Sequence, residues 1–448
     1  MANGSIFFDV NLPSPTTWFY FSALLAVALF FKFGRLLSVR NLDILTLFLL
    51  MPGFLLLHEK GTPRFWGYLW LLGASAFYLL RCLFDLTLIR RPALNPNINT
   101  GGLVWLAGAL FLSHIAVPLN QSGEPSNHGE TARAPIDPML REGEKMILQK
   151  APPDVDKVSV LVWVECGVTM LCHLSVVVGL VLIGKYHFEH LLAGMAAATL
   201  YLLLPYTYLL MPESPSGLGR WDHAWPMALM IWAVFFYRRP TLAGLFLGSA
   251  AGTAFFPALL LPLWLSFYWR RGGGRFGLTF ALSAGVCLAV LGGILWVNGE
   301  LPHALSYGWK PSAWLPWLPP DADTRGLWQG LPSHWAYRLP IFLAYIVLVG
   351  ATAFWPSPKN LAHLLALSAA LVLGIQFWYA DQGGIYVLWY LPFLLLLVFR
   401  PNLSACRPQP PGDDWLRRTG QKLKSFGWRM VRFVHPARPG HQVARIVP

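Results

Sequence analysis

Long apolar runs, separated by short polar segments, make up most of this 448-residue chain. Several runs are close to the roughly 20 residues that an α-helix needs to cross the hydrocarbon core of a membrane. The pattern predicts helices over 17–34, 42–57, 64–86, 102–119, 159–183, 190–211, 223–237, 276–297, 338–355, 361–379 and 384–399. We therefore expect an all-α polytopic membrane protein with about 11 transmembrane helices and one broken-helix hairpin.

The hairpin is predicted for the apolar stretch 240–269, which is too long for one crossing. A single helix there would measure about 45 Å, against a hydrocarbon core of about 30 Å. It would also separate Arg238-Arg239 from Arg270-Arg271, although basic loops tend to share the inner side. A break near Gly252-Thr253, with Pro257 following, keeps both pairs on one side. Because broken backbone at membrane depth needs protein or water to cover it, we expect this stretch to line a cavity.

The distribution of basic residues predicts the orientation. With the C-terminal tail inside, the short basic loops also fall inside and the N-terminus falls outside. The outer segments are then the N-terminus, 58–63, 120–158, 212–222, 298–337 and 380–383. Three regions follow: an accessory block (1–100), a core that holds the long outer loops (101–400), and a cytosolic tail (401–448).

Composition supports the membrane class and adds little about chemistry. Apolar residues make up 55% of the chain and charged residues 12%, about half the usual share in soluble proteins. The net charge of +13 requires no nucleic-acid partner, because the basic residues lie mostly at span ends and in the tail. The five cysteines are scattered and predict neither a disulfide framework nor a zinc site. The N-terminus lacks the basic residues of a cleavable signal peptide.

A family resemblance starts at the predicted hairpin. The run from Arg239 to Pro262 reads RPTLAGLFLGSAAGTAFFPALLLP. It resembles the AGLxLGLAAxxKxxPxLLLP segment of the GT-C membrane glycosyltransferases, and is most similar to family 87, the polyprenyl-phosphate-mannose-dependent mannosyltransferases. Residues 385–401 (IYVLWYLPFLLLLVFRP) resemble the last helix of that family, so the resemblance covers about 101–401. This chain has Ala254 where the family usually has a Lys, which puts in doubt any phosphate contact of that Lys.

The resemblance implies a carboxylate on the non-cytosolic side that acts as general base. The family places it in the first outer loop of the core, here 120–158. The acids of this loop are Glu124, Glu130, Asp137, Glu142, Glu144, Asp154 and Asp156. We select Asp137 because it lies between Pro135 and Pro138, just before an amphipathic segment over 139–149. The alternative is a solvated linker of mixed charge.

The other outer loops supply candidates for binding. The segment Arg220-Trp221-Asp222-His223 places a guanidinium cation, a carboxylate and a His at a helix start. This set is suited to anion binding or acid–base catalysis. Asp222, our second catalytic candidate, can equally be a helix cap. Further residues predicted to bind the donor phosphate are Lys310, His334 and Arg338, with Arg220 and His223. Residues predicted to stack on sugars are Trp309, Trp314, Trp317 and Trp335, although an interfacial aromatic belt explains them too.

Polar residues inside the predicted spans are functional candidates by default. His114 and Glu165 lie near the outer ends of adjacent spans, and His173 lies two turns from Glu165. The alternative is pairing inside the bundle. Arg81 and Asp85 are four residues apart and predict a structural ion pair. No local spacing supplies three or four metal ligands, so we expect no required cofactor, and a divalent metal is an alternative that the sequence does not support.

The tail 413–434 has an apolar face surrounded by Arg and Lys, which predicts a helix on the anionic inner leaflet. Together these features predict a bacterial cell-membrane enzyme that transfers a sugar from a polyprenyl-phosphate sugar to a lipid or glycan acceptor. A transporter or flippase with the broken pair as its gate is one alternative. A catalytically inactive assembly subunit is another, favoured by Ala254.

Overall fold

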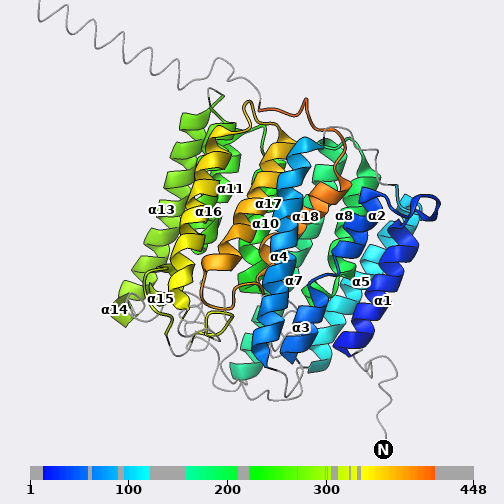
Figure 1. Cartoon of the computed structure of the whole chain (residues 1–448), viewed down its shortest axis with the longest axis horizontal. Coiled ribbons are helices and arrows are strands. Elements are labelled where there is room, and N and C mark those ends of the chain that lie inside the picture. Colours follow the sequence, from blue (N-terminus) through cyan, green and yellow to red (C-terminus); the bar gives the residue numbers. More distant parts are fainter. Residues whose placement is uncertain are drawn as a thin grey trace, which may run out of the picture.

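The computed structural model describes residues 14–58, 63–88, 95–121, 157–209, 221–269, 271–297, 299, 301–303, 311–321, 324–329 and 334–408. Every regular element in these ranges is a helix, as predicted, and the longer helices lie side by side in one bundle (Figure 1). The α-helices are α1 (Pro15–Phe30), α2 (Val39–Thr46), α3 (Met51–His58), α4 (Arg64–Phe84), α5 (Thr100–Gln121), α7 (Lys157–Tyr186), α8 (Leu191–Leu203), α9 (Pro205–Leu209), α10 (Trp221–Phe235), α11 (Pro240–Thr253), α12 (Leu261–Phe267), α13 (Gly273–Val297), α14 (Leu301–His303), α15 (Pro311–Trp314), α16 (Arg338–Phe354), α17 (Leu361–Trp378) and α18 (Leu391–Phe399). Short 3₁₀ turns are η1 (Phe33–Arg35), η2 (Asp85–Thr87), η3 (Phe256–Leu260), η5 (Trp335–Tyr337) and η6 (Val387–Trp389).

Among the residues that the structure describes, six helical segments are long and apolar enough to cross a membrane. They are Val39–His58, Arg64–Thr87, Cys166–Tyr186, Gly273–Val297, Trp335–Phe354 and Leu361–Trp378. This supports the predicted class of helical membrane protein. The predicted count of about eleven crossings also relies on shorter apolar segments such as Thr16–Phe30, Thr100–Ala116 and Leu191–Leu203, whose length does not establish a crossing.

The predicted break in 240–269 is present. Helix α11 ends at Thr253, and Ala254 is extended with φ −143° and ψ 146°. The chain then passes through η3 into α12 and returns to the start of α11. The return is shown by Tyr268, whose hydroxyl donates to the Tyr237 carbonyl at 2.7 Å. We call this end of the bundle the basic end; it is the upper end in Figure 1. The opposite end, which carries 311–329 and 379–389, is the loop end.

Three glycines of α11 allow α13 to lie directly against it. A Cβ on Gly244 would lie 2.5 Å from the Phe276 carbonyl oxygen, and one on Gly252 would lie 2.8 Å from the Ala284 oxygen. Gly248, between them, meets Phe280 in the same way. Residue numbers rise together along both helices, so α11 and α13 are parallel.

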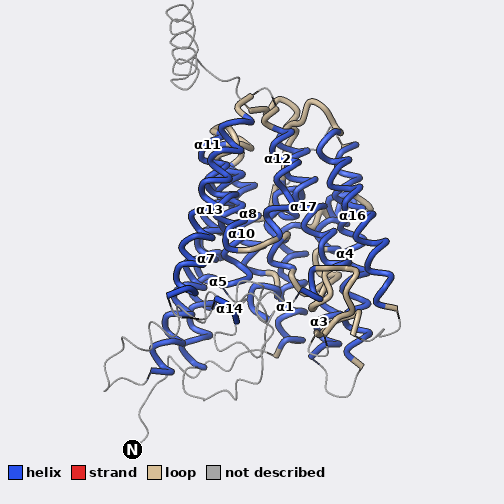
Figure 2. The backbone as a smooth tube through the Cα atoms, turned by 90° about the vertical axis from the view of Figure 1, so that its left-hand side faces the viewer, coloured by secondary structure: helices blue, strands red, loops and turns tan. Residues whose placement is uncertain are grey.

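Two predicted spans are interrupted. The chain is extended at Leu204, between α8 and α9, because the residue before a proline avoids helical geometry. The predicted helix 384–399 is helical only in its second half, where α18 begins at Leu391. Its first half is a loop with Gly384 at φ +102°, followed by η6. In Figure 2 the connecting loops gather mainly toward the two ends of the bundle.

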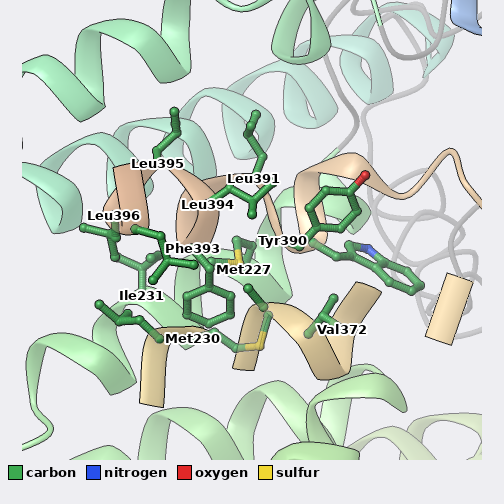
Figure 3. Close-up of a cluster of buried hydrophobic side chains, with 14 of the residues drawn as sticks. Met227, Met230, Ile231, Val372, Tyr390, Leu391, Phe393, Leu394, Leu395 and Leu396 are labelled. Carbon is green, nitrogen blue, oxygen red and sulfur yellow. The ribbon is translucent and has the colours of Figure 1, made fainter. Parts of the chain in front are cut away.

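The centre of the bundle is apolar and closely covered. Side chains of α10, α17 and α18 meet there, among them Met227, Met230, Val372 and Phe393 (Figure 3). Helices on both sides of the predicted boundary near residue 100 belong to one hydrophobic core. Helix α4 of the N-terminal block packs against α17.

A buried ion network joins the same regions at the basic end. The predicted pair is present, with Arg81 Nη1 3.0 Å from Asp85 Oδ1. Arg81 also binds both carboxylate oxygens of Asp43, at 2.7 and 2.8 Å. Asp85 in turn binds Arg400, just after α18, at 2.6 Å. The network therefore links α2 and α4 to the end of the last helix.

Candidate functional site

A fully buried acid lies in the first turn of α10, at the loop end. Asp222 has 0% exposure and His223 beside it has 2%. The partial positive charge of a helix N-terminus stabilises an acid in the first turn. Asp222 lies near Cys172 of α7 and Tyr386, which precedes α18. This predicted catalytic residue therefore faces the interior of the bundle.

An aromatic stack connects α10 with the helix break. The His223 and Tyr386 rings are 5.5 Å apart and inclined by 21°. Tyr386 stacks on Trp389 at 4.1 Å, and Trp389 on Phe256 at 4.0 Å. We call these four residues the aromatic stack. It covers η3, the broken part of the chain, with packed side chains.

The last turn of α11, with the break that follows it, contacts α10 and the segments 311–314 and 379–386 at the loop end. The Thr253 hydroxyl donates to the carbonyls of Ser249 and Ala250, and Trp225 Nε1 donates to that hydroxyl. Next to the break, the Phe255 ring lies 4.8 Å from Trp314 and 5.3 Å from Tyr379. Ala254, at the position of the family Lys, is buried with 6% exposure.

The loop 379–386 holds a second carboxylate near the stack. Asp381 is 9% exposed, and its Oδ1 accepts from the Arg325 backbone N–H at 3.2 Å. The Tyr386 hydroxyl donates to the Asp381 carbonyl at 3.0 Å, and the Asp381 charge acts on Tyr386. Gln382 next to it has φ +55°, an uncommon conformation for a residue other than glycine. Tyr386 thus lies near both Asp222 and Asp381.

Asp381 is the functional candidate that sequence reasoning did not select. Its only sequence signal is an acid in a short turn between two apolar segments, Tyr379-Ala-Asp381-Gln382, before Gly383-Gly384. That turn is held in place by α4, because a Cβ on Gly384 would lie 2.9 Å from Leu71 Cβ. Helix α4 of the N-terminal block therefore packs against the turn that carries Asp381.

Arg338, predicted to bind phosphate, is buried, and its guanidinium is hydrogen-bonded to backbone carbonyl groups. Its guanidinium donates to four carbonyl oxygens, at 2.8 to 3.2 Å. The acceptors belong to Ser312, Ala313, Leu318 and Trp378. This arrangement holds the loop-end segment 311–318 against the end of α17.

The remaining predicted residues are distributed unevenly. Asp222, His223 and Trp314 come together around the stack and the break. Trp317 and His334 are exposed and Trp335 is half-buried, and the His334 ring lies 5.8 Å from Tyr337. Asp137, Arg220, Lys310 and Trp309 lie outside the described residues.

The predicted polar residues of the spans bind partners inside the bundle. His114 Nδ1 lies 2.6 Å from the Leu110 carbonyl, and its Nε2 lies 3.4 Å from the Thr207 hydroxyl. His173 Nδ1 lies 2.7 Å from the Tyr201 hydroxyl. The side chain of Glu165 is outside the described part, so the predicted meeting of His114 with Glu165 stays a prediction.

The arrangement defines a polytopic helical membrane protein with two buried carboxylates and an aromatic stack at one end. Among the residues that the structure describes, no three His, Cys, Asp or Glu side chains form a group that could hold a metal ion. Comparison with protein-family models, with curated proteins and with solved structures finds no match.

Proposed function

We propose that this chain is a GT-C-like membrane glycosyltransferase, which moves one sugar from a polyprenyl-phosphate sugar to a lipid or glycan acceptor. The observation that carries the proposal is the buried Asp222, held at the start of α10 beside the aromatic stack and the tip of the broken helix pair. A positioned carboxylate near a hydroxyl can act as general base. The resemblance of 239–262 to GT-C enzymes supports the same assignment.

In the proposed reaction, Asp222 takes the proton of the acceptor hydroxyl as its oxygen bonds to the anomeric carbon of the donor sugar. The bond from that carbon to the phosphate oxygen breaks, and polyprenyl phosphate leaves with the bonding electrons. Arg220, His223, Lys310 and His334 remain the candidates that bind this phosphate. Asp137 remains an alternative base. No cofactor takes part in the proposed step.

Tryptophans near the site suit the sugar part of the substrates. Trp314 lies against Phe255 at the break, and Trp317 is exposed on the same outer segment. With Trp309 and Trp335, they form our proposed acceptor surface. Since the Arg338 guanidinium donates to four backbone carbonyls, we assign it a positioning role, which is to hold this segment in place.

The proposed setting is a bacterial cell membrane, with the loop end on the non-cytosolic face. Eleven crossings and the hairpin then place the N-terminus outside and the C-terminus inside. The predicted helix over 413–434 lies on the anionic inner leaflet.

A catalytically inactive assembly subunit is the second candidate, and Ala254 favours it. At the family's Lys position this chain has a short apolar side chain, Ala254, which is buried at the break itself. A protein with this substitution lacks one cation that the family resemblance would place near a phosphate. The two candidates differ in whether the donor is consumed.

The test is a transfer assay with purified protein in proteoliposomes. Radiolabelled polyprenyl-phosphate sugars are added with a lipid extract as acceptor, and released polyprenyl phosphate and labelled product are both measured. An active enzyme yields the two in equal amounts. Donor that remains intact while the protein is folded supports the inactive subunit. Donor that crosses the bilayer without reacting indicates a transporter instead.

A further inference from the structure

The basic end carries a cluster of arginines that the proposed function does not use. The hairpin returns α12 to the start of α11, so Arg238 and Arg239 come close to Arg271. The approach is tight at Gly272, where a Cβ would lie 2.8 Å from Pro240 Cγ. Gly272 also has φ +106°, a conformation that favours glycine.

A fourth arginine joins from the segment after α18. Arg271 Nη1 donates to the Pro408 carbonyl at 2.7 Å, which brings the exposed Arg407 to the same place. We call Arg238, Arg239, Arg271 and Arg407 the arginine cluster. Three segments that are far apart in sequence therefore contribute to it.

The cluster has little negative charge to balance it. In the described part of the chain, no carboxylate forms a salt bridge with these four side chains. Arg238 donates to the Tyr237 hydroxyl at 3.1 Å, and the Glu189 charge also acts on it. The first turns of α11 and α13, which begin here, contain no acid. Among the described residues, the one carboxylate whose charge acts on these four guanidinium groups is that of Glu189. Such a group of guanidiniums attracts anions, and its planar geometry suits phosphate oxygens.

Apolar side chains next to the cluster identify the kind of anion. Trp269 is 72% exposed, two residues before Arg271, and Leu278 on the adjoining turns of α13 is 54% exposed. Tryptophan at the edge of an apolar surface is typical of the membrane–water interface. A lipid can place its phosphate on the arginines and its chains along α13, whereas a soluble anion makes no use of the apolar surface.

We infer that the arginine cluster is a binding site for the headgroup of one anionic phospholipid, in the leaflet next to the basic end. The inference does not depend on the proposed function. The four arginines of the site are also different residues from those of the tail 413–434, which was predicted from sequence to lie on anionic lipid.

The experiment is native mass spectrometry of the full chain, titrated in detergent with phosphatidylglycerol or with phosphatidylcholine of the same chains. The variant carries Arg238→Gln, Arg239→Gln and Arg271→Gln. One basic residue near an anionic surface contributes about fivefold in affinity, so three lost charges weaken phosphatidylglycerol binding about 100-fold. Binding of phosphatidylcholine stays the same. The matching Arg→Lys variant keeps most of the preference, because it keeps the charge.

Two further arms make the result decisive. A tail variant, with Arg417, Arg418 and Lys422 replaced by Gln, keeps the preference if the cluster is the site. We expect that inorganic phosphate, at the same concentration as the lipid, does not displace bound phosphatidylglycerol from the wild type. If the triple variant does not fold, Arg239→Gln alone gives a loss of about fivefold. The proposal is overturned if the cluster variants bind phosphatidylglycerol as the wild type does, if the tail variant loses the preference instead, or if free phosphate competes equally.

Discussion

Replacing Asp85 with Ala tests whether the buried ion network holds the N-terminal block to the end of the core. Asp85 is the only carboxylate in the described network that binds two arginines, and the Arg400 side chain is 3% exposed. Without Asp85, Arg400 keeps only carbonyl acceptors, those of residue 85, Leu88 and Pro401. Removing one partner of a buried ion pair typically costs about 3–5 kcal/mol, so we expect a loss of that size.

Asp43→Ala is the matched control. It also removes a carboxylate from Arg81, but Arg81 keeps Asp85 and is more exposed, with 15% of its side chain accessible. We expect a loss of about 1–3 kcal/mol. The free energy of unfolding is measured by SDS titration in mixed micelles, with Arg35→Ala as an exposed reference. Equal costs for Asp85→Ala and Asp43→Ala, or an Asp85 cost no larger than the Arg35 reference, would refute the reasoning.

Three other experiments test the fold. In a background without native cysteines, Arg239→Cys and Gly274→Cys should react with a membrane-impermeant reagent from the same side, because the hairpin returns to the basic end; labelling from opposite sides would make 240–269 a single crossing. Gly248→Leu should cost about 1–3 kcal/mol or more in an unfolding titration, since its Cβ would lie 2.8 Å from Phe280 Cα. Gly285→Leu, which has open space around it, should stay within about 0.5 kcal/mol, and equal effects would contradict the close α11–α13 contact. Arg338→Met should cost at least about 3 kcal/mol, because it removes four hydrogen bonds from a charged group, and an unchanged unfolding midpoint would show that they contribute nothing.

Local sequence rules predicted what depends on near neighbours. The Arg81–Asp85 pair followed from a spacing of four residues, and the break near Gly252-Thr253 followed from length and from Pro257. Both are present. The same rules could not reveal Asp43 or Arg400 as partners. These lie 38 residues from Arg81 and 315 residues from Asp85, and only the packed bundle brings them together.

The site shows the same limit. Hydropathy predicted a continuous helix over 384–399, because Tyr, Val, Leu and Trp count as apolar in any conformation. In the structure Tyr386 and Trp389 pack over the break in a non-helical segment. The Gly383-Gly384 turn, with Gly384 at positive φ, precedes this segment. Asp222 was selected as a candidate from the sequence because it lies at the start of a predicted span. Asp381 became a candidate only from its position in the folded chain. Arg338 was selected for its charge, but its surroundings of carbonyl groups could not be read from sequence.

The rate of donor consumption by Asp222→Asn, measured against wild type in the same proteoliposomes, tests the central claim most directly. The change keeps the shape of the side chain and a group able to cap α10, and it removes the proton acceptor. General base assistance typically accounts for about 10²–10⁴-fold in rate, so we expect a fall of that size with an unchanged unfolding midpoint. Asp321→Asn, an exposed acid at the same end, should stay within about twofold of wild type. Equal rates for Asp222→Asn and wild type would contradict the account.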